Sequence, residues 1–154
     1  LCQRVTAFAN KNCDGKIPLE IKFLDEDLLI LNKFKDNLDN IRSKIDNQNI
    51  NFYIDYIVNS LFEANKYFND QEPWKKKDDR IRLNTIVYTT LEIMRKISFL
   101  MYPIIPESSL KVLNIFDIEE KKVELKSISD NEYLIKGKKL NKIDILFKKI
   151  EKNQ

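Results

Sequence analysis

The residues best suited to binding chemistry are Trp74 and the lysines that follow it in the stretch EPWKKK. Trp74 is the single tryptophan, and Pro73 precedes it at the end of an amphipathic pattern, so the ring lies at a corner. An exposed indole stacks on bases, and the ammonium groups of Lys75 and Lys76 attract phosphates. The combination indicates binding of single-stranded nucleic acid. The alternatives are an indole packed at a helix corner and a solvated lysine run.

Arg4 is the second candidate binding residue. Its guanidinium can donate two hydrogen bonds to a base edge or bind a phosphate. It lies on a predicted helix over residues 1–12 whose other face is apolar, so an ordinary surface arginine is the alternative. Nothing in the spacing of the sequence connects Arg4 to Trp74.

The composition excludes several classes of active site. The chain has no histidine, which removes histidine-based acid–base catalysis, histidine-activated nucleophiles and the usual zinc ligand sets. Gly15 and Gly137 are isolated, so there is no glycine-rich phosphate-binding loop. Cys2 and Cys13 would lie about 16 Å apart on one helix, too far for a disulfide, and we expect reduced thiols in a cytosolic protein. We expect no catalytic residue and no metal site in this chain.

Length and charge allow a single domain with an appendage. The 154 residues are 43% hydrophobic, which is enough for a core, and the net charge of +3 neither requires nor excludes a polyanionic partner. No run approaches 18 apolar residues, so we expect no membrane span. The chain begins without Met and inside a predicted helix, and we therefore expect a fragment of a longer protein.

Apolar periodicity predicts an all-α fold. Helices are predicted over residues 1–12, 25–45, 54–68, 78–101 and 108–116. The predicted inward faces are Leu28, Leu31, Phe34, Leu38, Ile41 and Ile45 in the second helix, Ile54, Ile57, Val58, Leu61, Ala64, Asn65 and Phe68 in the third, and Val87, Leu91, Met94, Ser98 and Met101 in the fourth.

Breaker and charged residues mark the ends of these helices. Gly15 follows the first helix and Pro73 the third. The acidic pair at residues 78–79 predicts the start of the fourth helix, with local charge pairing to Arg80 and Arg82.

After residue 116 the spacing of apolar residues changes. Loose alternation over residues 122–126 and 132–136 predicts at most a small hairpin, and residues 141–151 have helical spacing. We predict an antiparallel bundle of four or five helices over residues 1–115. Residues 116–154 would form a tail that packs on the bundle or on a domain missing from this chain.

Four stretches resemble the anticodon-binding domain of methionyl-tRNA synthetase, a class I enzyme. The family's first helix, with an arginine three residues after a leucine and an Asp-Gly stop, is similar to LCQRVTAFANKNCDGKIP. Its helix ending in Ala-Asn-x-Tyr before a Pro-Trp corner is similar to IVNSLFEANKYFNDQEPWKK. Its proline-flanked bundle end and its closing segment resemble LMYPIIPESSLKVL and GKKLNKIDILFKKIE, although a basic pair stands where Pro-Arg is common. The likeness covers essentially the whole chain.

The resemblance implies that the bundle reads the CAU anticodon of methionine and initiator tRNA. It assigns Trp74 to stacking on the first anticodon base, a cytosine, and Arg4 to hydrogen bonding with the anticodon bases. Further tRNA contacts are expected from Pro73, Lys75, Lys76 and Lys11. The family's anticodon-contacting asparagine would immediately precede Leu1 and is not in this chain.

The resemblance also implies a longer cytoplasmic enzyme, an ATP-dependent methionine–tRNA ligase. Its sites for ATP with magnesium and for methionine, and any zinc insert, would lie in an N-terminal catalytic domain upstream of this chain. We expect the chain alone to hold no cofactor, to be inactive in aminoacylation and to have no membrane or DNA partner.

Two other functions stay open from the sequence. Class I synthetases for valine, leucine, isoleucine or cysteine carry similar bundles, although the Pro-Trp corner disfavours them. A helical protein-interaction module would instead use Trp74, Tyr67 and Phe68 to anchor a partner helix. Burial separates the two uses of the indole, because base stacking needs an open ring close to Arg4.

Overall fold

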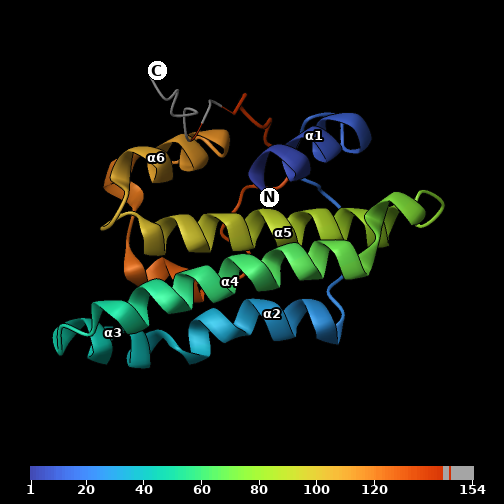
Figure 1. The fold of residues 1–154 in the computed structure, drawn as a ribbon. Coiled ribbons are helices and arrows are strands. Elements are labelled where there is room, and N and C mark those ends of the chain that lie inside the picture. The colour runs from blue at the N-terminus through green and yellow to red at the C-terminus, as the bar shows by residue number, and fades with distance from the viewer. Residues whose placement is uncertain (144–145, 147–154) are drawn as a thin grey trace, which may run out of the picture.

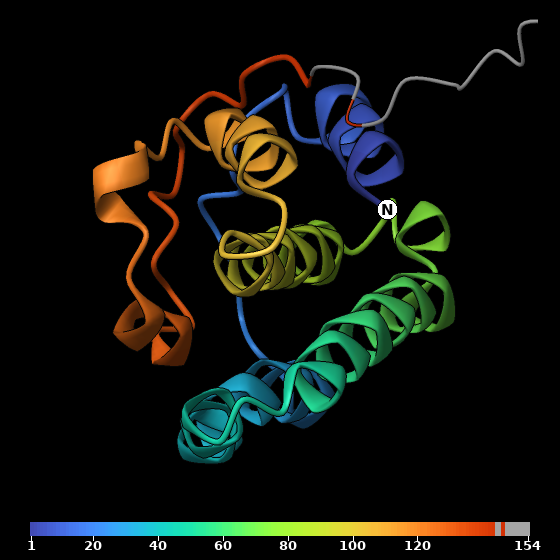
Figure 2. The same ribbon diagram turned by 60° about the vertical axis from the view of Figure 1, so that its left-hand side comes forward.

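The computed structural model describes residues 1–143 and 146, and its helices surround one central helix (Figures 1 and 2). The α-helices are α1 (Cys2–Asn12), α2 (Asp25–Asp36), α3 (Leu38–Asp46), α4 (Ile50–Gln71), α5 (Arg80–Met101) and α6 (Pro106–Ile115). Short 3-10 helices are η1 (Pro73–Lys75), η2 (Glu120–Lys122) and η3 (Leu125–Ser129). The described residues contain no strand, only an isolated antiparallel bridge between Lys16 and Lys139. The predicted all-α class is confirmed.

Helix α5 is the axis of the molecule. In Figure 2 it runs through the centre, and α6, α1, α4, the pair of α2 and α3, and the segment of η2 and η3 lie around it in that order, so α1 and α4 are neighbours. Residues 85–100 are buried without interruption, so α5 has no solvent-facing side over this length. The prediction of one inward face for this helix was wrong, because helices pack on it from several directions.

The predicted helix over residues 25–45 is two helices, α2 and α3, separated at Asn37. The Asn37 side-chain amide donates to the Lys33 carbonyl at 2.8 Å and competes for the acceptor that continues the helix. Phe34 and Ile41 are buried as expected, whereas Leu28 and Ile45 are exposed.

Helix α4 buries Ile57, Ala64 and Phe68 of the predicted face but is rotated from the predicted orientation. Ile54 and Val58 are 40% and 41% exposed, whereas Tyr53 and Tyr67 are buried. Both tyrosine hydroxyls find partners inside, since Tyr53 donates to the Leu100 carbonyl and Tyr67 to a carboxylate of α2. The tyrosines therefore turn the helix slightly from the orientation that aliphatic periodicity alone predicts.

The predicted hairpin over residues 122–126 and 132–136 is wrong. The segment forms η2, η3 and turns, and its backbone polar groups are bound by buried side chains of α5 instead of by a second strand. Arg95 donates to the Asp130 carbonyl at 2.8 Å, and Lys96 donates to the Ile128 carbonyl at 2.6 Å. Glu92 accepts from the Leu134 amide at 2.6 Å.

The predicted tail shares the core of the bundle where it is described. Ile128, Leu134 and Leu140 belong to the same buried cluster as the helices. The division of the chain at residue 115 stays a prediction. The predicted helix over residues 141–151 falls largely on residues 144–145 and 147–154, which lie outside the described residues, and residues 141–143 are not helical.

A buried carboxylate joins α2, α4 and α5. Asp27 is fully buried, and Arg82 donates two hydrogen bonds to its carboxylate, from Nη1 to Oδ2 at 2.6 Å and from Nη2 to Oδ1 at 3.0 Å. Tyr67 donates to the same carboxylate, and burial and the adjacent Asp27 raise the pKa of the Tyr67 hydroxyl. Arg82 also donates to Gln71 at 2.6 Å, at the end of α4. The predicted local pairing of Arg82 was wrong, since its partners lie on other helices, although Asp79 does cap α5 through the Arg82 amide at 2.9 Å.

The Arg82 cluster predicts a large loss of stability for Arg82→Met. The change would leave the Asp27 carboxylate buried without a cation, which costs about 3–5 kcal/mol. Urea unfolding followed by circular dichroism measures the free energy of unfolding. Arg80→Met is the matched control, because Arg80 is exposed, and we expect it to cost less than about 1 kcal/mol. Equal losses in the two variants would contradict the role of the cluster.

The buried amine of Lys96 predicts a pH-dependent stability. Burial and the adjacent Arg95 guanidinium lower the pKa of Lys96 to about 7. The carboxylates of Glu92 and Asp130 act in the other direction and raise this pKa, but their effect is smaller. In the unfolded chain the amine keeps its proton to about pH 10, so from about pH 7 to 10 the unfolded state binds more protons. The free energy of unfolding should therefore rise with pH, by at most about 1.4 kcal/mol per pH unit.

Denaturation of the wild type and of Lys96→Met across that window tests this prediction. The variant should show a flatter profile, because the titrating amine is gone. Burial raises the pKa of Cys13 to about 11 and also raises that of Cys2, which favours the unfolded state above about pH 9. The raised pKa values of Tyr67 and Tyr88 act in the same direction above about pH 10, so the rise in stability is expected between about pH 7 and 9. Parallel profiles for the two proteins would show that Lys96 stays charged in the fold.

Candidate nucleic-acid interface

The chain reverses direction at the corner between α4 and α5. Glu72 caps α4 in the left-handed conformation, with φ 45° and ψ 56°, and Pro73 begins η1 directly after it. The Lys75 amide donates to the Glu72 carbonyl at 2.8 Å, which closes the turn. Pro73 is buried, whereas Trp74 is 41% exposed. The corner therefore anchors its proline and projects its indole.

The indole rests on one aromatic neighbour. Trp74 contacts Phe68 of α4 with 6.1 Å between ring centroids and 66° between ring planes. Phe68 is buried, and Phe8 of α1 meets it edge to face at 5.8 Å. These contacts hold the orientation of the indole by favourable aromatic geometry while part of its surface stays accessible.

Arg4 meets the same aromatic ring. Its guanidinium carbon lies 5.1 Å from the Phe68 centroid, within cation–π distance. Nη1 donates to the Asn69 side-chain oxygen at 2.9 Å, and Nη2 lies 3.4 Å from that of Asn65. The structure thus brings together Arg4 and Trp74, which the sequence left unconnected, through their shared neighbour Phe68.

The predicted lysine contacts lie around this pair. Lys75 forms an ion pair with Glu72 at 2.7 Å, and Lys76 is exposed. Lys11 is exposed in the last turn of α1. It follows Arg4 by seven residues, which places it on nearly the same helix face about 10 Å along the axis.

Asn65 and Asn69 of the corner site were missed as binding residues, and Phe68 was named only as an anchor for a partner helix. Asn65, Phe68 and Asn69 lie at spacings of three and four on α4, next to the Pro-Trp corner. That spacing shows that they share a face. It does not show that α1 packs against that face, so their contact with Arg4 could not be predicted.

The corner offers groups for binding rather than for catalysis. The guanidinium has five N–H donors, and the two asparagine oxygens engage two of its nitrogens, so donors remain for a ligand beside the indole. Burial raises the pKa of the Cys13 thiol to about 11 and also raises that of Cys2, which makes both poor nucleophiles. In the part of the chain that the structure describes, no group of three His, Cys, Asp or Glu side chains could hold a metal ion.

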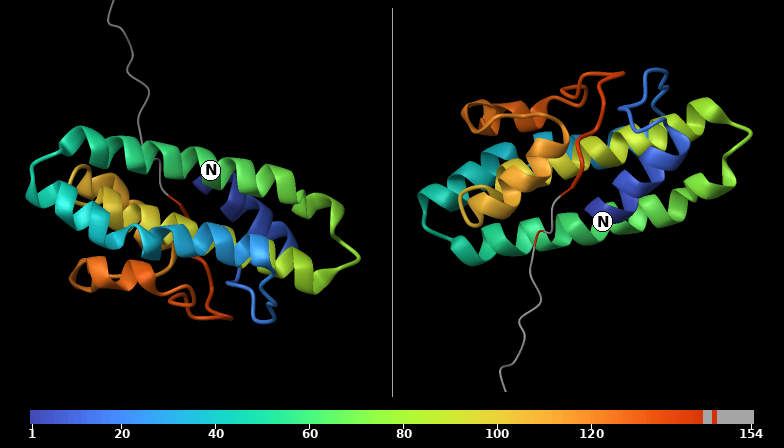
Figure 3. Two further views of the ribbon diagram at one scale, coloured as in Figure 1. Left: turned by 90° about the horizontal axis from the view of Figure 1, so that it is seen from below. Right: turned by 90° about the horizontal axis from the view of Figure 1, so that it is seen from above.

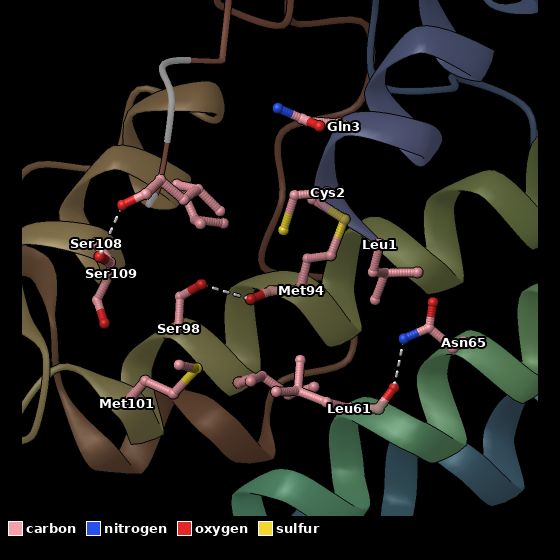
Figure 4. A pocket seen from close by; sticks show the side chains of 13 residues that line it. Leu1, Cys2, Gln3, Leu61, Asn65, Met94, Ser98, Met101, Ser108 and Ser109 are labelled. Atoms are coloured by element: carbon pink, nitrogen blue, oxygen red, sulfur yellow. Dashed lines mark hydrogen bonds between the residues drawn. The ribbon is translucent and has the colours of Figure 1, made fainter. Parts of the chain in front are cut away.

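A pocket of about 470 Å³, which shares Asn65 with the corner site, opens where the start of α1 meets α4, α5 and α6 (Figure 4). Its walls are largely apolar, with Cys2, Met94 and Met101 among them. The Ser98 hydroxyl donates to the Met94 carbonyl at 2.8 Å. This pocket lacks the aromatic platform and the guanidinium, so the corner is the better candidate for base binding. Among the described helices, none combines the length and apolarity required to cross a bilayer.

One known protein family matches most of the chain. A family described as the anticodon binding domain of methionyl tRNA ligase matches residues 17–154. Arg4 lies before the matched range.

Curated relatives agree with this match. The methionine–tRNA ligase of Brucella suis is 35% identical over 119 residues, covering 77% of this chain and 23% of that protein. The Mycobacterium leprae enzyme is 34% identical over 125 residues, covering 78% of this chain and 23% of that protein. The chain thus spans about a quarter of the length of these relatives.

Solved structures extend the likeness to α1. The apo form of Mycobacterium tuberculosis methionyl-tRNA synthetase superposes with a TM-score of 0.89 at 27% identity, covering 99% of this chain and 31% of that one. The same enzyme bound by methionyl-adenylate superposes with a TM-score of 0.86 at 28% identity, over 96% of this chain and 30% of that one.

Proposed function

Because the chain belongs to the family of the anticodon-binding domain of methionyl-tRNA ligase, we propose that it binds the CAU anticodon of methionine and initiator tRNA. The observation that carries the proposal is the contact of Arg4 and Trp74 with one buried ring, that of Phe68. An exposed aromatic plane and a guanidinium at one corner are the two groups that recognition of an unstacked base needs.

Trp74 stacks on the first anticodon base, a cytosine. Phe68 and the η1 turn already hold the indole in the free protein, so little conformational entropy is lost when a base stacks on it. Pro73 contributes by fixing the start of the η1 turn, where it is buried.

Arg4 reads the edge of the base. Asn65 and Asn69 orient its guanidinium, which leaves N–H groups to donate toward the oxygen and ring-nitrogen acceptors of cytosine. Uracil carries an N–H at that ring nitrogen and would oppose a donor there. Lys11, Lys75 and Lys76 contribute attraction for phosphates, which is independent of sequence.

The longer protein is an ATP-dependent methionine–tRNA ligase of the cytoplasm, in which this chain provides tRNA specificity to an N-terminal catalytic domain. Gly15 and Gly137 are isolated and form no glycine-rich phosphate-binding loop, and the described residues offer no metal-ligand cluster for zinc. No step of the ligase reaction is therefore assigned to this chain, and we expect it to be inactive alone.

A helical protein-interaction module is the less supported alternative. It accounts for an exposed indole but gives no reason for the oriented guanidinium beside it. The family match likewise favours the methionine enzyme over class I synthetases for other amino acids.

Trp74→Ala should weaken binding of a CAU anticodon stem-loop by about one to two decades, the loss of one stacked base. Fluorescence anisotropy of a labelled stem-loop measures the dissociation constant, and circular dichroism checks the helices. Trp74→Phe should retain part of the affinity because a smaller aromatic plane remains. Unchanged binding by a folded Trp74→Ala variant would remove the indole from the site.

Arg4→Gln should reduce the preference for cytosine at the first anticodon position more than it reduces overall RNA affinity. Titration with CAU stem-loops and with loops mismatched at that position gives both quantities. Arg42→Gln, an exposed arginine on α3, is the matched control and should change neither. Equal losses on all stem-loops would reduce Arg4 to a phosphate contact.

A further inference from the structure

Two lysines face each other just beyond the end of α1. The isolated antiparallel bridge pairs Lys16 with Lys139. The Ile17 amide donates to the Lys138 carbonyl and the Leu140 amide to the Gly15 carbonyl, both at 2.8 Å. These two bonds flank the lysines, which makes them a non-hydrogen-bonded pair, the arrangement in which opposing side chains lie closest.

This pairing puts two positive charges on one face. Directly opposed residues of an antiparallel pair point to the same side, and like charges there destabilise the pairing. Both lysines are exposed, and among the described residues neither has a carboxylate within ion-pair distance. The adjacent Lys138, by contrast, is neutralised by Asp117 at 2.7 Å. As far as the described residues go, the bridge therefore presents a cationic pair without a carboxylate partner to solvent.

The pair lies toward the same end of the bundle as the Pro-Trp corner. Lys16 comes four residues after Asn12, the last residue of α1, and Arg80 at the start of α5 donates to the Asn12 carbonyl at 2.7 Å. Figures 1 and 3 show the turn after α1 and the corner between α4 and α5 toward one end of the molecule. Arg4 and Lys11 share a face of α1, so this helix leads from the base-binding corner toward the lysine pair.

We propose that Lys16 and Lys139 together bind a backbone phosphate of the tRNA next to its anticodon loop. This inference rests on the proposed function, because it needs the anticodon seated on Trp74 and Arg4. Each ammonium carries three donors, and a phosphate between the two removes their mutual repulsion. Such a contact sets the position of the RNA and carries no sequence information.

The salt dependence of binding tests the proposal. In Lys16→Ala/Lys139→Ala, the slope of log Kd against log salt for a CAU stem-loop should be smaller in magnitude by about 1, the share of one neutralised phosphate. Affinity at low salt should fall about five- to tenfold. The preference for CAU over mismatched loops should be unchanged, because the contact does not read bases.

The matched control is Lys121→Ala/Lys122→Ala. It removes two exposed lysines of η2, toward the end of the molecule opposite the corner (Figures 1 and 3), of which Lys121 is paired with Glu119 at 2.7 Å. Its slope should stay near that of the wild type. If both double variants lose the same slope, the effect is one of net charge and the proposed phosphate site is wrong.

Lys139→Glu separates binding from folding. An opposite-charge pair with Lys16 should stabilise the bridge, so the melting temperature should not fall. Its affinity for the stem-loop should fall more than that of Lys139→Ala, because the carboxylate repels the phosphate. Wild-type affinity in Lys139→Glu would overturn the inference. Absence of any CAU preference in the wild type would instead count against the proposed function.

Discussion

The buried Asp27 carboxylate is the constraint on which the arrangement of this molecule depends. A charge in the core must be paired, and Arg82 and Tyr67 satisfy it from α5 and α4 while Asp27 itself lies in the first turn of α2. Arg82 then reaches Gln71, directly before the corner. One ionic cluster thus fixes three helices and the point at which the chain turns toward Trp74.

The candidate site uses the rigidity that this cluster provides. Phe68 is buried at the end of α4, and on it meet the indole of the corner and the guanidinium of α1. Neither Trp74 nor Arg4 is placed by its own helix alone. Their geometry depends on how α1 crosses α4, with the side chains of Asn65 and Asn69 completing the contact. Binding groups held in this way lose little entropy when a ligand arrives.

A second buried cluster explains why the later part of the chain is irregular yet ordered. Glu92, Arg95 and Lys96 are fully buried in the middle of α5 and bind backbone groups of residues 127–134. Those groups would otherwise need a β-partner. Over residues 122–126 the alternation that resembled a strand reflects alternating burial, and the hydrogen bonds that determine the conformation of the segment come from another element.

Local patterns of the sequence were sufficient for the all-α class, for most helix ends and for a Pro-Trp corner, whereas the exposure of the ring at that corner is known from the structure. Periodicity, caps and breakers act between residues close in the chain, so they can be read there. The break at Asn37, the orientation of α4 and the meeting of Arg4 with Phe68 and Trp74 were decided by tertiary structure. Arg4 and Asn69 are 65 positions apart, and only the packing of both α1 and α4 on α5, which balances many distant contacts at once, brings them within 2.9 Å.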